Sequence, residues 1–151
     1  MTASNLTNAP IGRRAITIPD PGAADWQFVL PPGFDWKFVC GLGILVASAT
    51  VGSRFYGLNI YDNISGNPGP LNNVMYGVPN AQALAAGQSG NMHYVRNGGE
   101  LITAGQHAIL PVPDILLPAG WTIGSACFPL AGDHWSVIRI VLEAYPAVDS
   151  V

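Results

Sequence analysis

The chain has 151 residues, the length of one domain, and combines 49% hydrophobic residues with only 10% charged residues, 18 glycines and 13 prolines. This composition excludes a coiled coil, a helical bundle and a charged disordered tail. Six basic residues against nine acidic ones leave a net charge of −3, and the basic residues never cluster beyond one pair. Binding of nucleic acid through a basic patch is therefore not expected.

Residues 1–25 are polar, rich in proline and poor in alternation, which predicts an extended N-terminal arm. Fixing such a segment in one conformation costs roughly 1 to 2 kcal/mol per residue of backbone entropy, more than its few apolar side chains offset alone. We therefore expect the arm to serve assembly. A neighbouring subunit would order it by strand addition along Ala15, Ile16, Thr17 and Ile18.

Alternation of side chains predicts a long strand from residue 36 to about residue 50, with glycines at positions 41 and 43 where the strand can kink. Aromatic and β-branched residues predict a second strand over residues 54–61. The bulky face of the long strand is formed by its even positions, Trp36, Phe38, Cys40, Leu42, Ile44 and Val46.

Residues 63–91 carry no charge and mix asparagine, glycine and proline, which is typical of a long loop. Leu71, Met75 and Tyr76 make this loop too apolar for a solvated linker, so we expect it to pack on a partner or on the end of the domain. A loop that covers its own core is an equally open alternative. Only residues 81–86 have a composition that suits one or two helical turns.

The last candidate strand, residues 135–145, alternates clearly. Its core face is predicted to hold Ile138, Ile140, Leu142 and Ala144. Its other face holds Arg139, Val141 and Glu143, and we expect Arg139 and Glu143 to form an outward pair or to contact a partner. Further strands are predicted at residues 15–18, 26–30, 92–95, 101–110 and 121–128.

Seven or eight strands at this spacing, punctuated by turn residues, indicate an all-β fold. We predict an antiparallel β-sandwich or jelly roll over residues 26–151, with the arm at residues 1–25 and the long loop at residues 63–91. The uncharged segment 38–53 is shorter than the roughly 18 to 20 residues that span a bilayer and contains glycines, so no membrane association is expected.

The search for catalytic or metal-binding residues finds little. His93, His107, His134, Asp114 and Asp133 are the only candidates for acid/base or metal chemistry, and none stands at a ligand spacing within one element. Asp133 precedes the last strand at a turn, where a carboxylate accepts bonds from backbone N–H groups. We predict no enzyme, no cofactor and no metal site.

The first ten residues lack the basic and apolar regions of a secretory signal, so we expect a cytosolic chain with reduced thiols. Cys40 and Cys127 lie far apart in the sequence and are predicted to be free and buried. Trp26, Trp36, Trp121 and Trp135 each fall at the start of a strand, where a place in the core or a subunit interface is favoured over a platform for stacking sugars.

Parts of the sequence resemble small virion structural proteins of tailed bacteriophages. The resemblance is carried by Leu-Pro-Ala-Gly-Trp at residues 117–121, Ala-Gly-Asp-His-Trp-Ser at residues 131–136, the hydrophobic strand that follows, and the apolar strand at residues 45–54. It covers most of residues 26–145, without the arm and the long loop. It implies a non-enzymatic capsid decoration (cement) protein that bridges capsomers, and it supplies no catalytic residue.

The implied partners are the major capsid protein or other virion proteins, and the implied location is the virion, assembled in the host cytoplasm. We expect a homo-oligomer, with a trimer favoured. The shortage of charge, as in residues 115–132, agrees with a surface that other chains cover. A tail, baseplate or head-fibre component is the alternative within the virion, and a carbohydrate-binding module is the alternative from another class.

Overall fold

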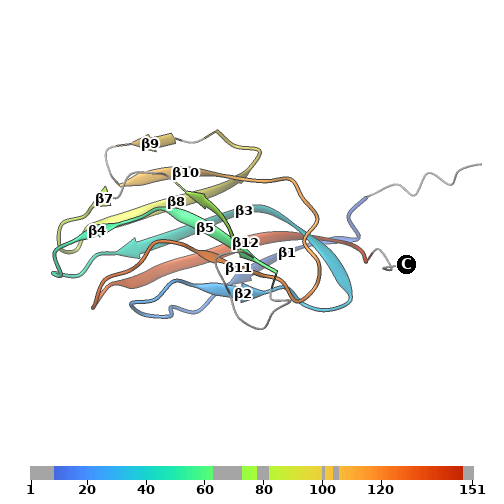
Figure 1. Cartoon of the computed structure of the whole chain (residues 1–151), viewed down its shortest axis with the longest axis horizontal. Helices are drawn as coiled ribbons and strands as arrows, with labels where there is room; N and C mark the ends of the chain where they lie inside the picture. The colour runs from blue at the N-terminus through green and yellow to red at the C-terminus, as the bar shows by residue number, and fades with distance from the viewer. Residues whose placement is uncertain (1–8, 63–72, 78–81, 100, 104–105, 148–151) are drawn as a thin grey trace, which may run out of the picture.

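The computed structural model describes residues 9–62, 73–77, 82–99, 101–103 and 106–147, and every regular element in these ranges is a β-strand (Figure 1). The all-β prediction is confirmed. The strands are β1 (Gly12–Thr17), β2 (Gln27–Val29), β3 (Phe34–Val46), β4 (Ser53–Arg54), β5 (Gly57–Tyr61), β6 (Asn73–Gly77), β7 (Gln82–Ala83), β8 (Ser89–Arg96), β9 (Leu101–Thr103), β10 (His107–Val112), β11 (Thr122–Ser125) and β12 (His134–Pro146).

Two sheets form a β-sandwich. One has six strands in the order β1-β12-β3-β8-β10-β9, and the other has four in the order β2-β11-β5-β6, while β4 and β7 form a short separate pair. Neighbouring strands are antiparallel except β8 and β10, which are parallel. The exception arises because β9 lies between β8 and β10 in the sequence but not in the sheet. Strand β9 pairs with the side of β10 that faces away from β8 and runs antiparallel to both, so β10 runs in the same direction as β8.

The core between the sheets is rich in aromatic residues. Trp26, Trp36 and Tyr94 are completely buried, and the rings of Trp26 and Tyr94 meet edge to face with centroids 5.9 Å apart. Full burial of a large apolar side chain contributes about 1.5 to 3 kcal/mol. The core face predicted for β12 is confirmed, because Ile138, Ile140, Leu142 and Ala144 are all buried.

A bulge in β3 changes which of its residues face the core. Phe38 lies opposite Leu142 of β12, and Cys40 lies opposite Val141, so Val39 is an extra residue without a counterpart. Such an insertion reverses the alternation of side chains beyond it. Before the bulge the even-numbered residues of β3 therefore point to the core, and after it the odd-numbered residues do.

The single bulky face predicted for this strand is wrong beyond the bulge. Trp36 and Phe38 are buried as expected, but after them the buried residues are Gly43 and Leu45. The period-two pattern in the sequence cannot show the bulge, because the extra residue leaves no mark in the composition. The even positions that point away from the core are Cys40, Leu42, Ile44 and Val46.

Glycines make this reversal possible. A Cβ atom on Gly41 would lie 3.0 Å from the ring of Phe38, and one on Gly43 would lie 3.0 Å from the ring of Trp135. The ring of Tyr94 lies against both glycines. Aromatic rings from neighbouring positions thus fill the space over two residues that have no side chain of their own.

The N-terminal arm is partly a strand of the chain's own sheet. Strand β1 pairs with β12 over its whole length, from Gly12 opposite Ala144 to Thr17 opposite Arg139. Ile16 packs against the core. The expectation that a neighbouring subunit must order residues 15–18 is wrong, because the backbone of β12 and the core supply the contacts that offset the cost in entropy. Residues 1–8 lie outside the described part.

The segment that follows β1 is also attached to the domain. The carboxylate of Asp20 accepts the backbone N–H of Trp135 at 2.9 Å, and the indole N–H of Trp135 donates to the carbonyl of Ala24. Asp25 accepts hydrogen bonds from the Ser125 hydroxyl and from the backbone N–H of Cys127. Residues 20–25 are therefore part of the sandwich.

The long loop predicted at residues 63–91 contains strands. Strand β6 forms an edge of the four-stranded sheet, with Met75 opposite Asn59 and Tyr76 opposite Leu58. The helical turns predicted over residues 81–86 are not formed, since Gln82 and Ala83 pair with β4 instead. Leu71 and the ranges 63–72 and 78–81 lie outside the described residues. The predicted strands 54–61 and 101–110 are each divided into two.

Both cysteines are free, as predicted, but only Cys127 is buried. Burial raises the pKa of the Cys127 thiol well above its ordinary value. Cys40 is exposed because it follows the bulge in β3.

We expect the substitution Ile140→Ala to lower the free energy of unfolding by about 2 to 5 kcal/mol, because Ile140 is completely buried and the lost volume leaves a cavity. Chemical denaturation measures the change. The matched control is Val141→Ala on the next residue, which is half-exposed on the other face and should cost at most about 1 kcal/mol. Equal costs for the two variants would contradict the assignment of the faces.

Candidate interaction surface

The six-stranded sheet turns one face to the core and one away from it, here named the outer face. No element in the described ranges covers the outer face, and apart from Glu143 and Tyr145 at one end its side chains stay half-exposed or exposed. The register places Arg139, His93 and Asn91 among its apolar side chains, so the face mixes apolar and polar groups. Uncovered apolar side chains rimmed by polar ones are typical of a surface that binds another protein. Its apolar members, from β3, β8, β10 and β12, are Cys40, Leu42, Ile44, Val46, Val95, Ile109, Pro111, Val137 and Val141.

One end of the outer face carries a group of charged residues centred on Glu143. Arg13 of β1 and Arg96 of β8 reach the two carboxylate oxygens of Glu143 from opposite sides, the latter at 2.8 Å. The hydroxyl of Tyr145 donates to the same carboxylate at 3.1 Å. Glu143 is only 4% exposed although it lies on the outer face, because these side chains enclose it.

Lys37 and Asp114 complete this group. The ammonium of Lys37 lies 2.9 Å from Asp114 and 5.4 Å from the centre of the Tyr145 ring, and Arg96 approaches Asp114 at 3.7 Å. Three basic and two acidic side chains thus pair with one another at this end of the face. We call Arg13, Lys37, Arg96, Asp114, Glu143 and Tyr145 the charged cluster.

The expected outward pair of Arg139 and Glu143 is not formed. Glu143 binds the arginines of β1 and β8, which lie across the sheet from it, while Arg139 is exposed. Hydrogen bonds from Arg13 and then Arg96 lower the pKa of Glu143 to about 2, although burial opposes this shift. The arginine partners of Glu143 are more than 40 residues away in sequence, so strand spacing could not reveal them.

At the opposite end of the sandwich, Arg54 and Asp133 form an ion pair with both side chains fully buried. The guanidinium of Arg54 donates through Nε and Nη2 to the two carboxylate oxygens, at 2.9 and 2.7 Å. Asp133 also accepts the backbone N–H groups of Ser48 and Leu130, both at 2.8 Å. The predicted role of Asp133 as an acceptor of backbone N–H groups is confirmed.

The charged partner of Asp133 was missed by the sequence analysis. Arg54 precedes it by 79 residues, and no local spacing connects the two. Burial alone would raise the pKa of Asp133, but the hydrogen bonds from Arg54, Ser48 and Leu130 hold it well below its ordinary value. The carboxylate is therefore charged and fully occupied, which suits a structural role.

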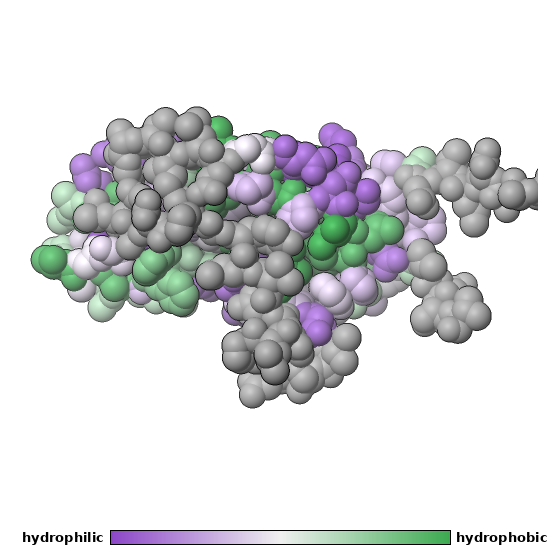
Figure 2. Space-filling view, turned by 45° about the horizontal axis from the view of Figure 1, so that its top comes forward, coloured by the Kyte–Doolittle hydropathy of each residue, from purple (hydrophilic) through white to green (hydrophobic). Residues whose placement is uncertain are grey.

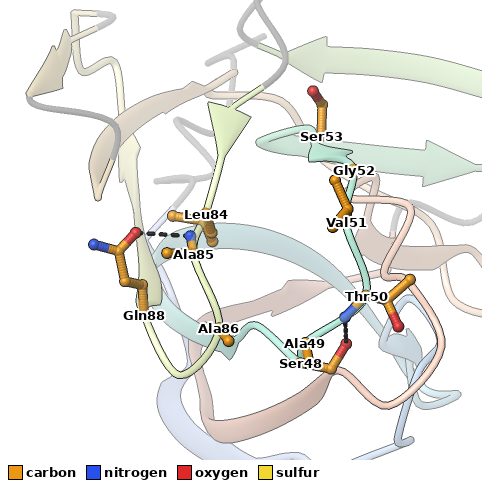
Figure 3. Close-up of a pocket in the computed structure, with 10 residues that line it drawn as sticks. All are labelled: Ser48, Ala49, Thr50, Val51, Gly52, Ser53, Leu84, Ala85, Ala86 and Gln88. Atoms are coloured by element: carbon orange, nitrogen blue, oxygen red, sulfur yellow. Dashed lines mark hydrogen bonds between the residues drawn. The ribbon is translucent and has the colours of Figure 1, made fainter.

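A hollow of about 540 Å³ lies beside this ion pair, between the segment 48–53 and the residues that lead into β8 (Figure 3). Its polar groups are already engaged. The hydroxyls of Ser48 and Thr50 both donate to the carbonyl of Ala131, and the side chain of Gln88 accepts the N–H of Ala85. Among the described residues, the lining of the hollow contains no charged side chain.

Exposed apolar side chains gather at the same end of the molecule. Val51 is 97% exposed, and the rings of Phe55 and Phe128 meet edge to face with centroids 5.5 Å apart. Phe128 has a φ of 50°, which is unusual for a bulky residue, and the carboxylate of Asp25 accepts its N–H at 3.3 Å. Figure 2 shows hydrophobic residues at the left end, where the loop after β3 lies in Figure 1.

The sequence-predicted interface residues lie in two places. Ala15 and Thr17 are exposed on β1, whereas Ile16 and Ile18 pack against the core. Met75 and Tyr76 belong to β6, in the other sheet, and Leu71 lies outside the described residues. The structure therefore does not join the two predicted patches into one surface.

The residues predicted as candidates for acid/base or metal chemistry also lie apart from one another. His93 and His107 stack on the outer face with ring centroids 6.3 Å apart, whereas Asp114 belongs to the charged cluster and Asp133 binds Arg54. Among the described residues, no three His, Cys, Asp or Glu side chains are grouped so that they could hold a metal ion.

The tryptophans are mainly core residues. Trp26, Trp36 and Trp135 are at most 3% exposed, so none of the three can stack a sugar, and Trp121 packs partly buried against the core. The described part of the chain contains no helix with the length and apolar character that a membrane span requires. Comparison of the chain with protein families, curated proteins and solved structures finds no match.

The lowered pKa of Glu143 predicts a loss of stability in acid. The folded pKa of about 2 lies below the ordinary value of 4.5, so the contribution of Glu143 is complete above pH 4.5 and disappears as the pH falls towards 2. We expect Glu143→Gln to destabilise the protein at neutral pH and to differ little from the wild type near pH 2. Denaturation curves over this pH range measure the effect, and a difference that does not change with pH would contradict it.

The buried ion pair predicts a large effect of one substitution. We expect Asp133→Asn to lower the free energy of unfolding by about 3 to 5 kcal/mol, because the charge of Arg54 stays buried without a counter-charge. The matched control is Asp114→Asn, which removes the exposed partner of Lys37 and should leave stability nearly unchanged. Chemical denaturation of both variants tests this, and equal effects would contradict it.

Proposed function

We propose that the protein is a non-enzymatic structural component of a tailed bacteriophage particle, a capsid decoration protein that binds across neighbouring capsomers. The observation that carries the proposal is the apolar outer face. Its side chains extend over four adjacent strands without a covering layer in the described ranges. Covering such a face with another chain removes apolar surface from water and stabilises the assembly.

The geometry suits binding to a broad partner surface better than binding to a small molecule. Most of the outer face is an open sheet, with one hollow of about 500 Å³ near β1 that Thr17, Leu42 and Arg139 help to line. In the hollow beside Arg54 and Asp133, the hydroxyls of Ser48 and Thr50 are already hydrogen-bonded. Stable protein interfaces bury about 1,200 to 2,000 Å² in total, an area for which an uncovered six-stranded sheet is suited. A chain that binds only the assembled shell stabilises it by mass action.

The resemblance to phage virion proteins supports the same function. The segments 45–54 and 131–136 carry part of that resemblance, and the ion pair between Arg54 and Asp133 joins them in space. They therefore contribute to one structural unit at the end of the sandwich. A unit held by a buried ion pair gives a stable scaffold for presenting an interaction face.

The test uses particles from a strain that carries the gene and particles from the same strain after its deletion. We expect mass spectrometry to find the chain in washed wild-type particles, and we expect purified chain added to the deleted particles to bind and to raise their resistance to heat. Absence of the chain from the particles would overturn the proposal, and immunogold labelling of tails would assign it to the tail instead.

Two variants identify the surface. Ile44→Glu places a charge on the half-exposed outer face, between Val137 and Asn91, and we expect it to fold but to lose binding to the deleted particles, because the carboxylate would be buried with no counter-charge opposite it. Val51→Glu places the same charge on a residue that is 97% exposed at the end of the molecule, and it should bind like the wild type. Equal binding of both variants would exclude the outer face as the contact.

A further inference from the structure

Strand β1 is the edge of the six-stranded sheet, and among the described residues it pairs with β12 alone (Figure 1). We propose that two copies of the chain join through this edge, with β1 of one copy antiparallel to β1 of the other, so that the two sheets become one of twelve strands. This inference does not rest on the proposed function.

The direction of the backbone groups supports the pairing. The N–H of Ile18 donates to the carbonyl of Ile138, its counterpart in the register with β12. In an antiparallel ladder every second residue bonds to the partner strand. Ile16 and Arg14 therefore also bond to β12, and Arg13, Ala15 and Thr17 direct their N–H and C=O groups to the open edge.

One register satisfies all three open residues. If Ala15 lies opposite Ala15 of the second copy, Arg13 lies opposite Thr17, and each open residue meets an open residue. The ladder then closes six hydrogen bonds across the twofold axis. If the register is shifted by two residues towards the N-terminus, only four hydrogen bonds close. Arg14 of one copy then lies opposite Arg14 of the other, where like charges repel.

The side chains agree with this register. Ala15 would lie on the axis on the outer face, where its methyl group leaves room for its counterpart. Arg14 would lie opposite Ile16 on the inner side, so no two arginines meet across the edge. The β1 sequence is thus complementary to itself in the antiparallel direction, as an interface between identical copies requires.

Charged residues on an edge strand normally protect it from pairing with another chain. In β1, however, both arginines are turned back onto their own sheet. Arg13 binds Glu143, and the guanidinium of Arg14 lies 5.6 Å from the centre of the Trp36 ring. Neither charge projects beyond the edge, which is left open to a second strand.

The pairing closes with two copies, because a twofold axis through Ala15 uses the open edge of each. A dimer of this kind differs from the trimer expected from the sequence, and the mass measurement below distinguishes the two. It also keeps the two outer faces continuous, since the strands of both copies belong to one sheet. A second copy of this chain is therefore the occupant of the edge.

The first test measures molecular mass by light scattering and sedimentation over a series of concentrations. We expect a dimer for the wild type and a monomer for Ala15→Pro, which removes the central N–H donor of the pairing. Proline is tolerated on an edge strand where the N–H faces solvent, so the melting temperature of the variant should stay close to that of the wild type. A wild-type monomer or trimer would overturn the proposal.

The second test identifies the register through introduced thiols, in a Cys40→Ser background that removes the exposed native thiol. Residues opposite each other in a hydrogen-bonded pair have Cα atoms about 5.5 Å apart, within the range for a disulfide. Ala15→Cys should therefore form a covalent dimer on oxidation. Thr17→Cys is the matched control, because residue 17 faces residue 13 of the other copy. Efficient crosslinking of both, or of neither, would overturn the proposal.

Discussion

The buried ion pair between Arg54 and Asp133 is the interaction on which one whole end of the sandwich depends. Two charges without access to water are tolerated only when each is paired and hydrogen-bonded, and separating them is costly. Through Asp133 the pair also holds the backbone of Ser48 and Leu130. It thus joins the end of β3, the short strand β4 and the turn before β12, and with them the neighbouring hollow and aromatic pair.

The charged cluster around Glu143 has the same effect at the other end. Its arginines come from β1 and β8, which lie on the two sides of the β12 and β3 pair, so it ties four strands together on the outer face. Many of the chain's few charged residues lie at the two ends of the sandwich. Between the two ends, uncovered apolar side chains such as Leu42 and Ile44 alternate with Arg139, His93 and Asn91, and the apolar ones are the feature that favours contact with another chain.

The bulge at Val39 decides what that face contains. Before it, Trp36 and Phe38 belong to the core, and after it Leu42 and Ile44 point outwards. Core volume is restored by aromatic rings over Gly41 and Gly43. One inserted residue therefore turns several large apolar side chains from the core side of the sheet to its outer face, while aromatic rings fill the space over the two glycines.

Composition and alternation were enough to predict the all-β class, the core face of β12 and the acceptor role of Asp133, because these depend on neighbours in the sequence. Only the tertiary structure decided the outward face of β3, the place of β1 in the chain's own sheet, and the partners of Asp133 and Glu143. A bulge has no composition of its own, the cost of ordering a strand depends on what it pairs with, and ion pairs across the sheets join residues far apart in the sequence.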